Sequence, residues 1–270
     1  MNKAYVETTV LTDALLKPAT VKQAAAQAAL GRYQETLLPV YSIKELKAGP
    51  LDHYSYVHDK LVVTRSLAHT LNAVNSLNPV IEARRKSTSF EALEAAAQID
   101  KAHPGIHRLS SNADEEMADR YRLALAALII LSWQKRRNIT SKTIDDLECY
   151  TEAQPKIGKD GLFDLTPKEC AHDRHCSLWD ELKLETNQRL LIAMRDAIPE
   201  TSQRFEDKER RKVLKHLINT PKIPLDRKQC RALGDAVFAF FCPPDAVILT
   251  TNISDHRRLA RAIGKRAVKP

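Results

Sequence analysis

Residues 234–259 read GDAVFAFFCPPDAVILTTNISDHRRL and contain the clearest buried strand of the chain. Within them the run DAVILTT, residues 245–251, is short, apolar and rich in β-branched side chains, which is typical of a strand covered on both faces. Asp226 is a candidate N-cap for a preceding helix that Pro243-Pro244 ends. Ser254 is a candidate N-cap for the last helix. The C-terminal segment therefore predicts a helix–strand–helix unit.

The N-terminal segment carries a second set of strand and helix signals. Residues 4–12, AYVETTVLT, are rich in β-branched and aromatic types and predict a strand. An alanine-rich helical pattern follows at 19–36, and residues 37–41 predict a second short strand. The run S-I-K-E at 42–45 matches a capping box that opens a helix, and Gly49-Pro50 is expected to stop it.

The middle of the chain, residues 56–220, has a helical pattern almost throughout. One long helix is predicted over residues 112–137, and two more over 177–198 and 202–219. Residues 151–166 contain Pro155, Gly158 and Gly161 and predict a loop.

Strand signals thus occur at both ends of the chain, and two strands at one end with one at the other cannot make a stable sheet separately. We therefore expect an α/β fold in which residues 1–55 and 221–270 form one discontinuous domain with a mostly parallel sheet flanked by helices. An all-helical insertion, residues 56–220, would interrupt it.

Composition gives a broad indication of partners. The 270 residues include 42 Lys and Arg against 34 Asp and Glu, a net charge of +8. An excess of this kind favours acidic partners such as nucleic acid, although ordinary surface charge explains it equally well. Five cysteines without a pairing pattern favour a reducing cytoplasm. The N-terminus does not resemble a signal peptide, and the longest apolar run, Leu123–Trp133, is too short to cross a bilayer.

Four acidic residues fall near the predicted carboxyl ends of strands, where open α/β sheets bind ligands. They are Glu7, Glu45, Asp235 and Asp255. Clustered carboxylates bind hard divalent cations, which can activate water against a phosphodiester. Each acid also has a structural explanation: Glu45 as a capping partner, Asp255 at a helix start, and Glu7 on a solvent-facing strand. Asp235 lies among apolar residues and needs a partner.

The order of these segments resembles that of PIN-domain nucleases, a family that includes toxin-like endoribonucleases. The run YVETTVLTDALL resembles the family's opening strand, and LLPVYSIKELKAG its second strand and helix. The closing run matches the family pattern of a helix bearing an Asp, a strand, and then T-x-N-x-x-D followed by His. The resemblance covers roughly residues 1–55 and 221–270. The chain departs from it in having Glu7 where the family usually has Asp, and in the helical block that separates the second and third acids.

The resemblance implies that Glu7, Glu45, Asp235 and Asp255 hold Mg²⁺ or Mn²⁺ and activate a water for attack on RNA. Thr9 and Asn252 would hydrogen-bond to these ligands without contacting the metal ion. Three arginines on the last helix would bind the substrate phosphates: Arg257, Arg258 and Arg261. RNA is the implied partner, with a protein inhibitor and a second copy of the chain as further candidates and no membrane. A DNA-directed nuclease is a close variant of this hypothesis. The alternative from another class is a non-catalytic binding or regulatory protein on the same scaffold, which Glu7 in place of Asp favours.

Two further motifs carry alternatives. Cys170, His172, His175 and Cys176 combine zinc-ligand types, but familiar zinc motifs separate their ligand pairs more widely, and a polar helix end with ordinary thiols explains them too. The basic clusters at 84–86, 135–137 and 208–212 are typical of solvated helix faces.

Overall fold

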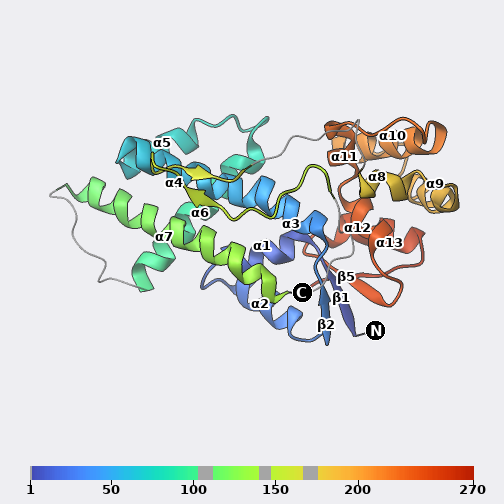
Figure 1. The fold of residues 1–270 in the computed structure, drawn as a ribbon, viewed down its shortest axis with the longest axis horizontal. Helices are drawn as coiled ribbons and strands as arrows, with labels where there is room; N and C mark the ends of the chain where they lie inside the picture. Colours follow the sequence, from blue (N-terminus) through green and yellow to red (C-terminus); the bar gives the residue numbers. More distant parts are fainter. Residues whose placement is uncertain (1, 103–111, 140–146, 167–175) are drawn as a thin grey trace.

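A computed structural model describes residues 2–102, 112–139, 147–166 and 176–270. Its centre is a small sheet of four parallel strands in the order β2-β1-β5-β6. These strands are β1 (Lys3–Val6), β2 (Glu35–Leu37), β5 (Ala246–Leu249) and β6 (Ala267–Val268). The two ends of the chain therefore share one sheet, as the sequence predicts, and the fold is mixed α/β with helices flanking the sheet (Figure 1).

The first strand is shorter than predicted. Residues 4–12 do not form one strand, because β1 ends at Val6 and α1 (Thr8–Leu16) begins immediately after Glu7. The β-branched residues of the run TTVLT that suggested a strand lie instead on a helix, where Val10 and Leu11 are fully buried. Burial of an apolar face outweighs the weak intrinsic preference of these residues.

The second strand and the helix after it also differ from prediction. β2 ends at Leu37, and α3 (Val40–Leu46) contains Ser42 instead of starting from it. The Ser42 hydroxyl donates to the Val6 carbonyl at 2.8 Å, so it ties α3 to the end of β1 and does not cap a helix. Gly49-Pro50 does not stop the helix, because a π-helical turn, η1 (Lys47–Leu51), carries it into α4 (Asp52–Thr64).

Helices cover both faces of the sheet, and the alternation of β1 separates two cores. Ala4 and Val6 face one core and Tyr5 faces the other. The first core contains α1 and α4 with α2 (Val21–Leu30), α5 (Leu67–Asn75), α6 (Ala83–Ala102) and α7 (Ala113–Lys135), which is followed by η2 (Arg136–Asn138). The second contains α8 (Ser177–Leu182), α9 (Gln188–Ala197), α10 (Phe205–Asn219), α11 (Arg227–Leu233), α12 (Asp235–Phe241) and α13 (Ile253–Ala262). The short helix η3 (Glu185–Asn187) precedes α9 and has no buried residue. Figure 1 shows the two groups on either side of the strands.

This arrangement bears on the expected insertion. Residues 56–220 contribute side chains to both cores, so among the described residues this block shares its cores with the strands of the sheet. The block is also not all-helical: β3 (Lys156–Ile157) and β4 (Phe163–Asp164) pair antiparallel as a separate two-stranded sheet within the predicted loop 151–166. A turn at Gly161, with φ of 80°, reverses the chain between them.

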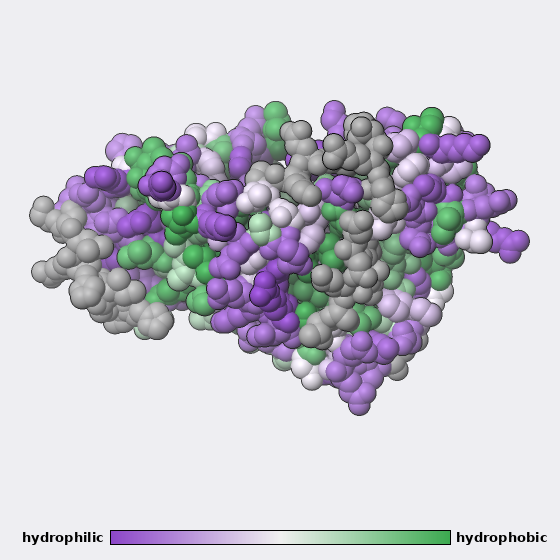
Figure 2. All heavy atoms as spheres, in the orientation of Figure 1, coloured by the Kyte–Doolittle hydropathy of each residue, from purple (hydrophilic) through white to green (hydrophobic). Residues whose placement is uncertain are grey.

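The face shown in Figure 2 is mainly hydrophilic, with smaller apolar areas between the polar ones. None of the helices in the described part of the chain has both the length and the apolar composition that a membrane span needs.

Phe238 is the aromatic centre of the second core. It is 1% exposed and makes edge-on contacts with Tyr5, Tyr41 and His256, whose ring centroids lie 6.2, 5.5 and 5.5 Å away. We expect Phe238→Ala to lower the free energy of unfolding by about 3–5 kcal/mol and Phe238→Leu by about 1 kcal/mol. Phe205→Ala, at a position 72% exposed, should change it by less than about 0.5 kcal/mol. Urea denaturation followed by circular dichroism measures all three, and equal losses at both positions would contradict this account.

Candidate functional site

Glu7 lies at the carboxyl end of the central strands. Its backbone N–H continues the ladder by donating to the Leu249 carbonyl at 3.1 Å, and its side chain is 5% exposed. The carboxylate accepts hydrogen bonds from the Thr9 hydroxyl and from the Thr250 hydroxyl, the latter at 3.2 Å. No cationic side chain among the described residues forms an ion pair with it, and burial raises the pKa of Glu7. Glu7 is therefore a buried acid held by hydroxyl groups.

Glu45 approaches the same region from α3. Its carboxylate accepts a hydrogen bond of 2.6 Å from the Thr8 hydroxyl, at the start of α1. Burial, together with the negative charges of Glu7 and Asp235, raises the pKa of Glu45 to about 7. Near neutral pH this carboxyl is therefore poised between its two protonation states.

Asp235 is the first residue of α12, directly after the kink at Gly234, whose φ is 40°. It has the partners that its apolar surroundings require: Arg210 at 2.8 Å and His256 at 3.2 Å. Burial alone would raise the pKa of Asp235, but the hydrogen bond and charge of His256 and the charge of Arg210 lower it overall. The pKa of His256 is correspondingly raised, because Asp235 and Glu7 outweigh its burial.

Asp255 lies in the first turn of α13, which begins after Asn252 and not after Ser254 as predicted. The guanidinium of Arg204 binds it in a bidentate manner, with one bond of 2.8 Å, and the Asn252 amide donates to it at 3.1 Å. These hydrogen bonds, with that of Arg204 the strongest influence, lower the pKa of Asp255 to about 2. Asp255 thus stays ionised at any physiological pH.

The structure brings the four predicted acids into one electrostatic neighbourhood but divides them into two pairs. The charge of Asp235 raises the pKa of Glu7 and of Glu45, and the charge of Glu7 also raises that of Glu45. The charge of Asp255 acts in the same direction on Asp235. Arginines pair with the two aspartates, whereas the two glutamates accept hydrogen bonds from threonines, and Glu7 also interacts with the charge of His256. Within the described residues, no group of three His, Cys, Asp or Glu side chains is arranged to hold a metal ion.

Oxygen donors of this kind suit a hard divalent cation, so the chemistry of the donor set fits Mg²⁺ or Mn²⁺. The present positions of the side chains fit such an ion only in part, because the carboxylate oxygens of Asp235 and Asp255 accept hydrogen bonds from Arg210 and Arg204. An ion that used all four carboxylates would have to replace these arginine contacts.

The supporting residues agree with the sequence in two cases. Thr9 contacts Glu7, and Asn252 contacts Asp255. Of the three arginines expected to bind substrate, Arg258 pairs instead with Asp207 at 2.5 Å, while Arg257 and Arg261 are exposed. Most of the Cys170–Cys176 motif lies outside the described residues.

Sequence reasoning missed Arg204, Arg210 and Thr8. Arg204 and Arg210 belong to the block that was interpreted as an insertion, and each lies far along the chain from the acid it binds. A signal for Arg210 was present: it shares a helical face with Val213, Leu214 and Leu217, and all four are buried. A charged residue on an apolar face of this kind implies a buried partner.

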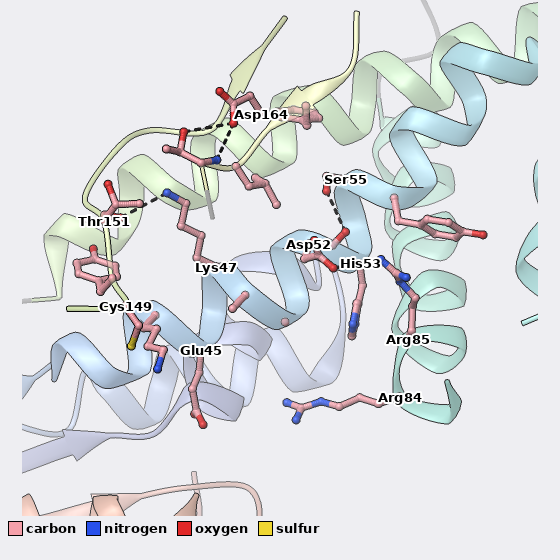
Figure 3. A pocket seen from close by; sticks show the side chains of 18 of the residues that line it. Glu45, Lys47, Asp52, His53, Ser55, Arg84, Arg85, Cys149, Thr151 and Asp164 are labelled. Carbon is pink, nitrogen blue, oxygen red and sulfur yellow. Dashed lines mark hydrogen bonds and ion pairs between the residues drawn. The ribbon is translucent and has the colours of Figure 1, made fainter. Parts of the chain in front are cut away.

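A pocket of about 980 Å³ opens beside Glu45, between α3, α4, α6, α11 and the β3–β4 segment (Figure 3). Its acidic residues are Glu45, Asp52, Asp59 and Asp164. Its basic residues are Lys44, Lys47, Lys60, Arg84, Arg85, Arg227 and Arg231. The cluster at 84–86, which the sequence favours as a solvated face, therefore contributes two side chains to a concave surface.

Comparison of the chain with models of known protein families, with curated proteins and with solved structures gave no match.

The two arginines should differ in their importance for stability. Arg210 is 5% exposed and also donates to the Leu233 carbonyl at 3.1 Å, whereas the side chain of Arg204 is 50% exposed. We expect Arg210→Ala to cost about 3–5 kcal/mol, because it leaves Asp235 with a buried charge and one partner fewer. Arg204→Ala should cost less than about 1 kcal/mol. Chemical denaturation of both variants measures these two losses of unfolding free energy. A larger loss for Arg204→Ala than for Arg210→Ala would show that the burial argument is wrong.

The raised pKa of Glu45 predicts how the free energy of unfolding changes with pH. Its folded pKa of about 7 exceeds its ordinary value of 4.5, so the unfolded chain loses this proton first as pH rises. The folded state therefore loses stability between about pH 4.5 and 7. Glu45→Gln cannot ionise and can still accept the Thr8 hydrogen bond. It should be more stable than the wild type at pH 8, by on the order of 1–3 kcal/mol, and equal to it at pH 4. Melting curves at the two pH values test this, and a pH-independent difference would rule it out.

Proposed function

We propose that this chain is a PIN-like, metal-dependent endoribonuclease whose site is formed by Glu7, Glu45, Asp235 and Asp255. The observation that supports the proposal is the electrostatic interaction of Asp235 with Glu7, Glu45 and Asp255, four acids from separate segments near the carboxyl ends of parallel strands. Buried like charges are unfavourable for folding, so a cluster of this kind is more typical of a functional site than of a structural one.

The residues of the site would have different roles in the reaction. Glu7, Glu45, Asp235 and Asp255 would hold Mg²⁺ or Mn²⁺, which supplies charge neutralisation and a more acidic bound water. Thr8, Thr9 and Thr250 would orient the glutamates through the hydrogen bonds that they already donate. If Glu45 did not hold the ion, it would orient the water, and its pKa of about 7 would suit it to accept a proton at neutral pH.

The second candidate is a non-catalytic binding or regulatory protein on the same scaffold. The contacts of Arg204 with Asp255 and of Arg210 with Asp235 favour it, because they neutralise two of the four acids without a metal ion. Glu7 in place of the family's Asp points the same way.

The decisive variant is Asp255→Asn. Asn keeps the size of the side chain and one acceptor for Arg204 or Asn252, but it removes the charge that a hard cation needs. Under the nuclease proposal, Mn²⁺ affinity by calorimetry and the rate of cleavage of mixed single-stranded RNA should both fall by about 100-fold or more. Cleavage by the wild type should stop in chelator, and single-stranded DNA in parallel reactions distinguishes the DNA-directed variant.

Asp245→Asn is a matched control, since Asp245 is a partly exposed carboxylate paired with Lys3 at the opposite end of β5. It should leave metal affinity and cleavage unchanged. Equal cleavage by wild type and Asp255→Asn, or cleavage that persists in chelator, would contradict the mechanism. Absence of cleavage and of metal binding in the wild type would support the binding-protein candidate instead.

A further inference from the structure

The pocket beside Glu45 has a charge pattern that the acid cluster does not explain. Seven of its lining side chains are basic and four are acidic, although it borders a site rich in carboxylates. Among the described residues, Arg84, Arg227 and Arg231 form no ion pair, and Lys44 contacts only the ring of Tyr41 as a cation, at 5.6 Å. Cations left without carboxylate partners on a concave surface favour an anionic ligand.

These cations come from separate helices that line the pocket. Figure 3 shows Arg84 extending from α6 toward Glu45, and its charge acts on both Glu45 and His53. Arg227 and Arg231 come from α11, the helix directly before the kink that positions Asp235. A ligand that contacts both groups of cations would therefore pass beside the acid cluster.

The pocket also offers polar and aromatic groups for a ligand with rings. His53 and Arg85 line the pocket. Burial lowers the pKa of His53, so its neutral ring presents one donor and one acceptor at neutral pH. Tyr56 and Phe163 line the same pocket. Aromatic rings next to cations are the usual surface for unpaired nucleic-acid bases and their phosphates.

The volume of the pocket limits which ligands can fill it. A volume of about 980 Å³ is at the upper end of the range of small-ligand pockets, about 300–1,000 Å³, so it exceeds what one phosphate or one ion fills. Single strands suit this surface better than a duplex, because only unpaired bases can stack on its aromatic rings.

We propose that this pocket binds a few nucleotides of a single-stranded nucleic acid and leads the strand past Glu45. Arg84 and Arg231 contact its phosphates from separate helices, and His53 and Tyr56 contact its bases. The inference rests on the proposed function, since it assigns the substrate path to that same site. It places this path between α6 and α11 instead of on the arginines of α13.

The test is binding without cleavage. Fluorescence anisotropy in chelator follows a labelled single-stranded RNA, the DNA of the same sequence, and the RNA duplex. Arg84→Ala/Arg231→Ala removes two charges from the pocket, and Lys22→Ala/Arg32→Ala removes two exposed charges that do not line it. We expect the pocket variant to bind single strands roughly tenfold more weakly and to lower the salt dependence by about 1.4 in log–log slope, as two lost phosphate contacts predict.

The control variant should bind like the wild type, and the duplex should bind more weakly than either single strand. The ratio of RNA to DNA affinity identifies which single strand the pocket prefers. Equal weakening by both double variants, or no binding of single strands by the wild type, would overturn the proposal. The failures of the two proposals can be distinguished. Binding through the pocket without metal-dependent cleavage would contradict only the nuclease proposal. Cleavage by the wild type, with unchanged binding by Arg84→Ala/Arg231→Ala, would contradict only the pocket proposal.

Discussion

The parallel pairing of β1 with β5 is the constraint on which the rest of the structure depends. It aligns Lys3 with Ala246 and Val6 with Leu249, residues 243 positions apart in the chain. Only this register places Glu7 beside Thr250 and brings the first turn of α13 to the same end of the sheet. Closing so long a loop costs entropy, but the cost grows only slowly with length and is offset by two cores that the strands separate. The acid cluster therefore cannot form locally and requires the complete fold.

Within the cluster, the glutamates and the aspartates have different hydrogen-bond partners, and their pKa values are shifted in opposite directions. Threonine hydroxyls hold Glu7 and Glu45 without neutralising them, so burial raises the pKa of both. His256 and Arg210 lower the pKa of Asp235, and Arg204 lowers that of Asp255, so both remain ionised. A pair of fixed charges beside a pair of groups that can exchange protons is a common way to divide roles in a hydrolytic site. The aspartates keep their charge through these contacts, whereas the protonation of the glutamates depends on pH.

The sequence predicts the parts of this structure that depend on local chemistry. The strand at β5, the helix start at Asn112 and the return of both chain ends to one parallel sheet follow from apolar runs, caps and proline positions. The errors occur where tertiary packing decides. The run TTVLT has a strand-like composition but packs as a helix, and Pro50 is accommodated in a π-helical turn. The contacts of Arg204 and Arg210 connect residues whose separation no periodic pattern encodes.

The difference between these two arginines indicates how the site could be used. Arg210 is buried between α10 and the Gly234 kink, and its release would leave unpaired charges in the second core. Arg204 is half-exposed, so its guanidinium can exchange Asp255 for water at small cost. An ion that competes for carboxylate oxygens therefore meets less resistance at Asp255 than at Asp235. Glu45 borders the basic pocket, whereas Asp255 is not among the residues that line it. A strand bound in the pocket would thus reach the cluster at Glu45, while Arg204 controls access to Asp255.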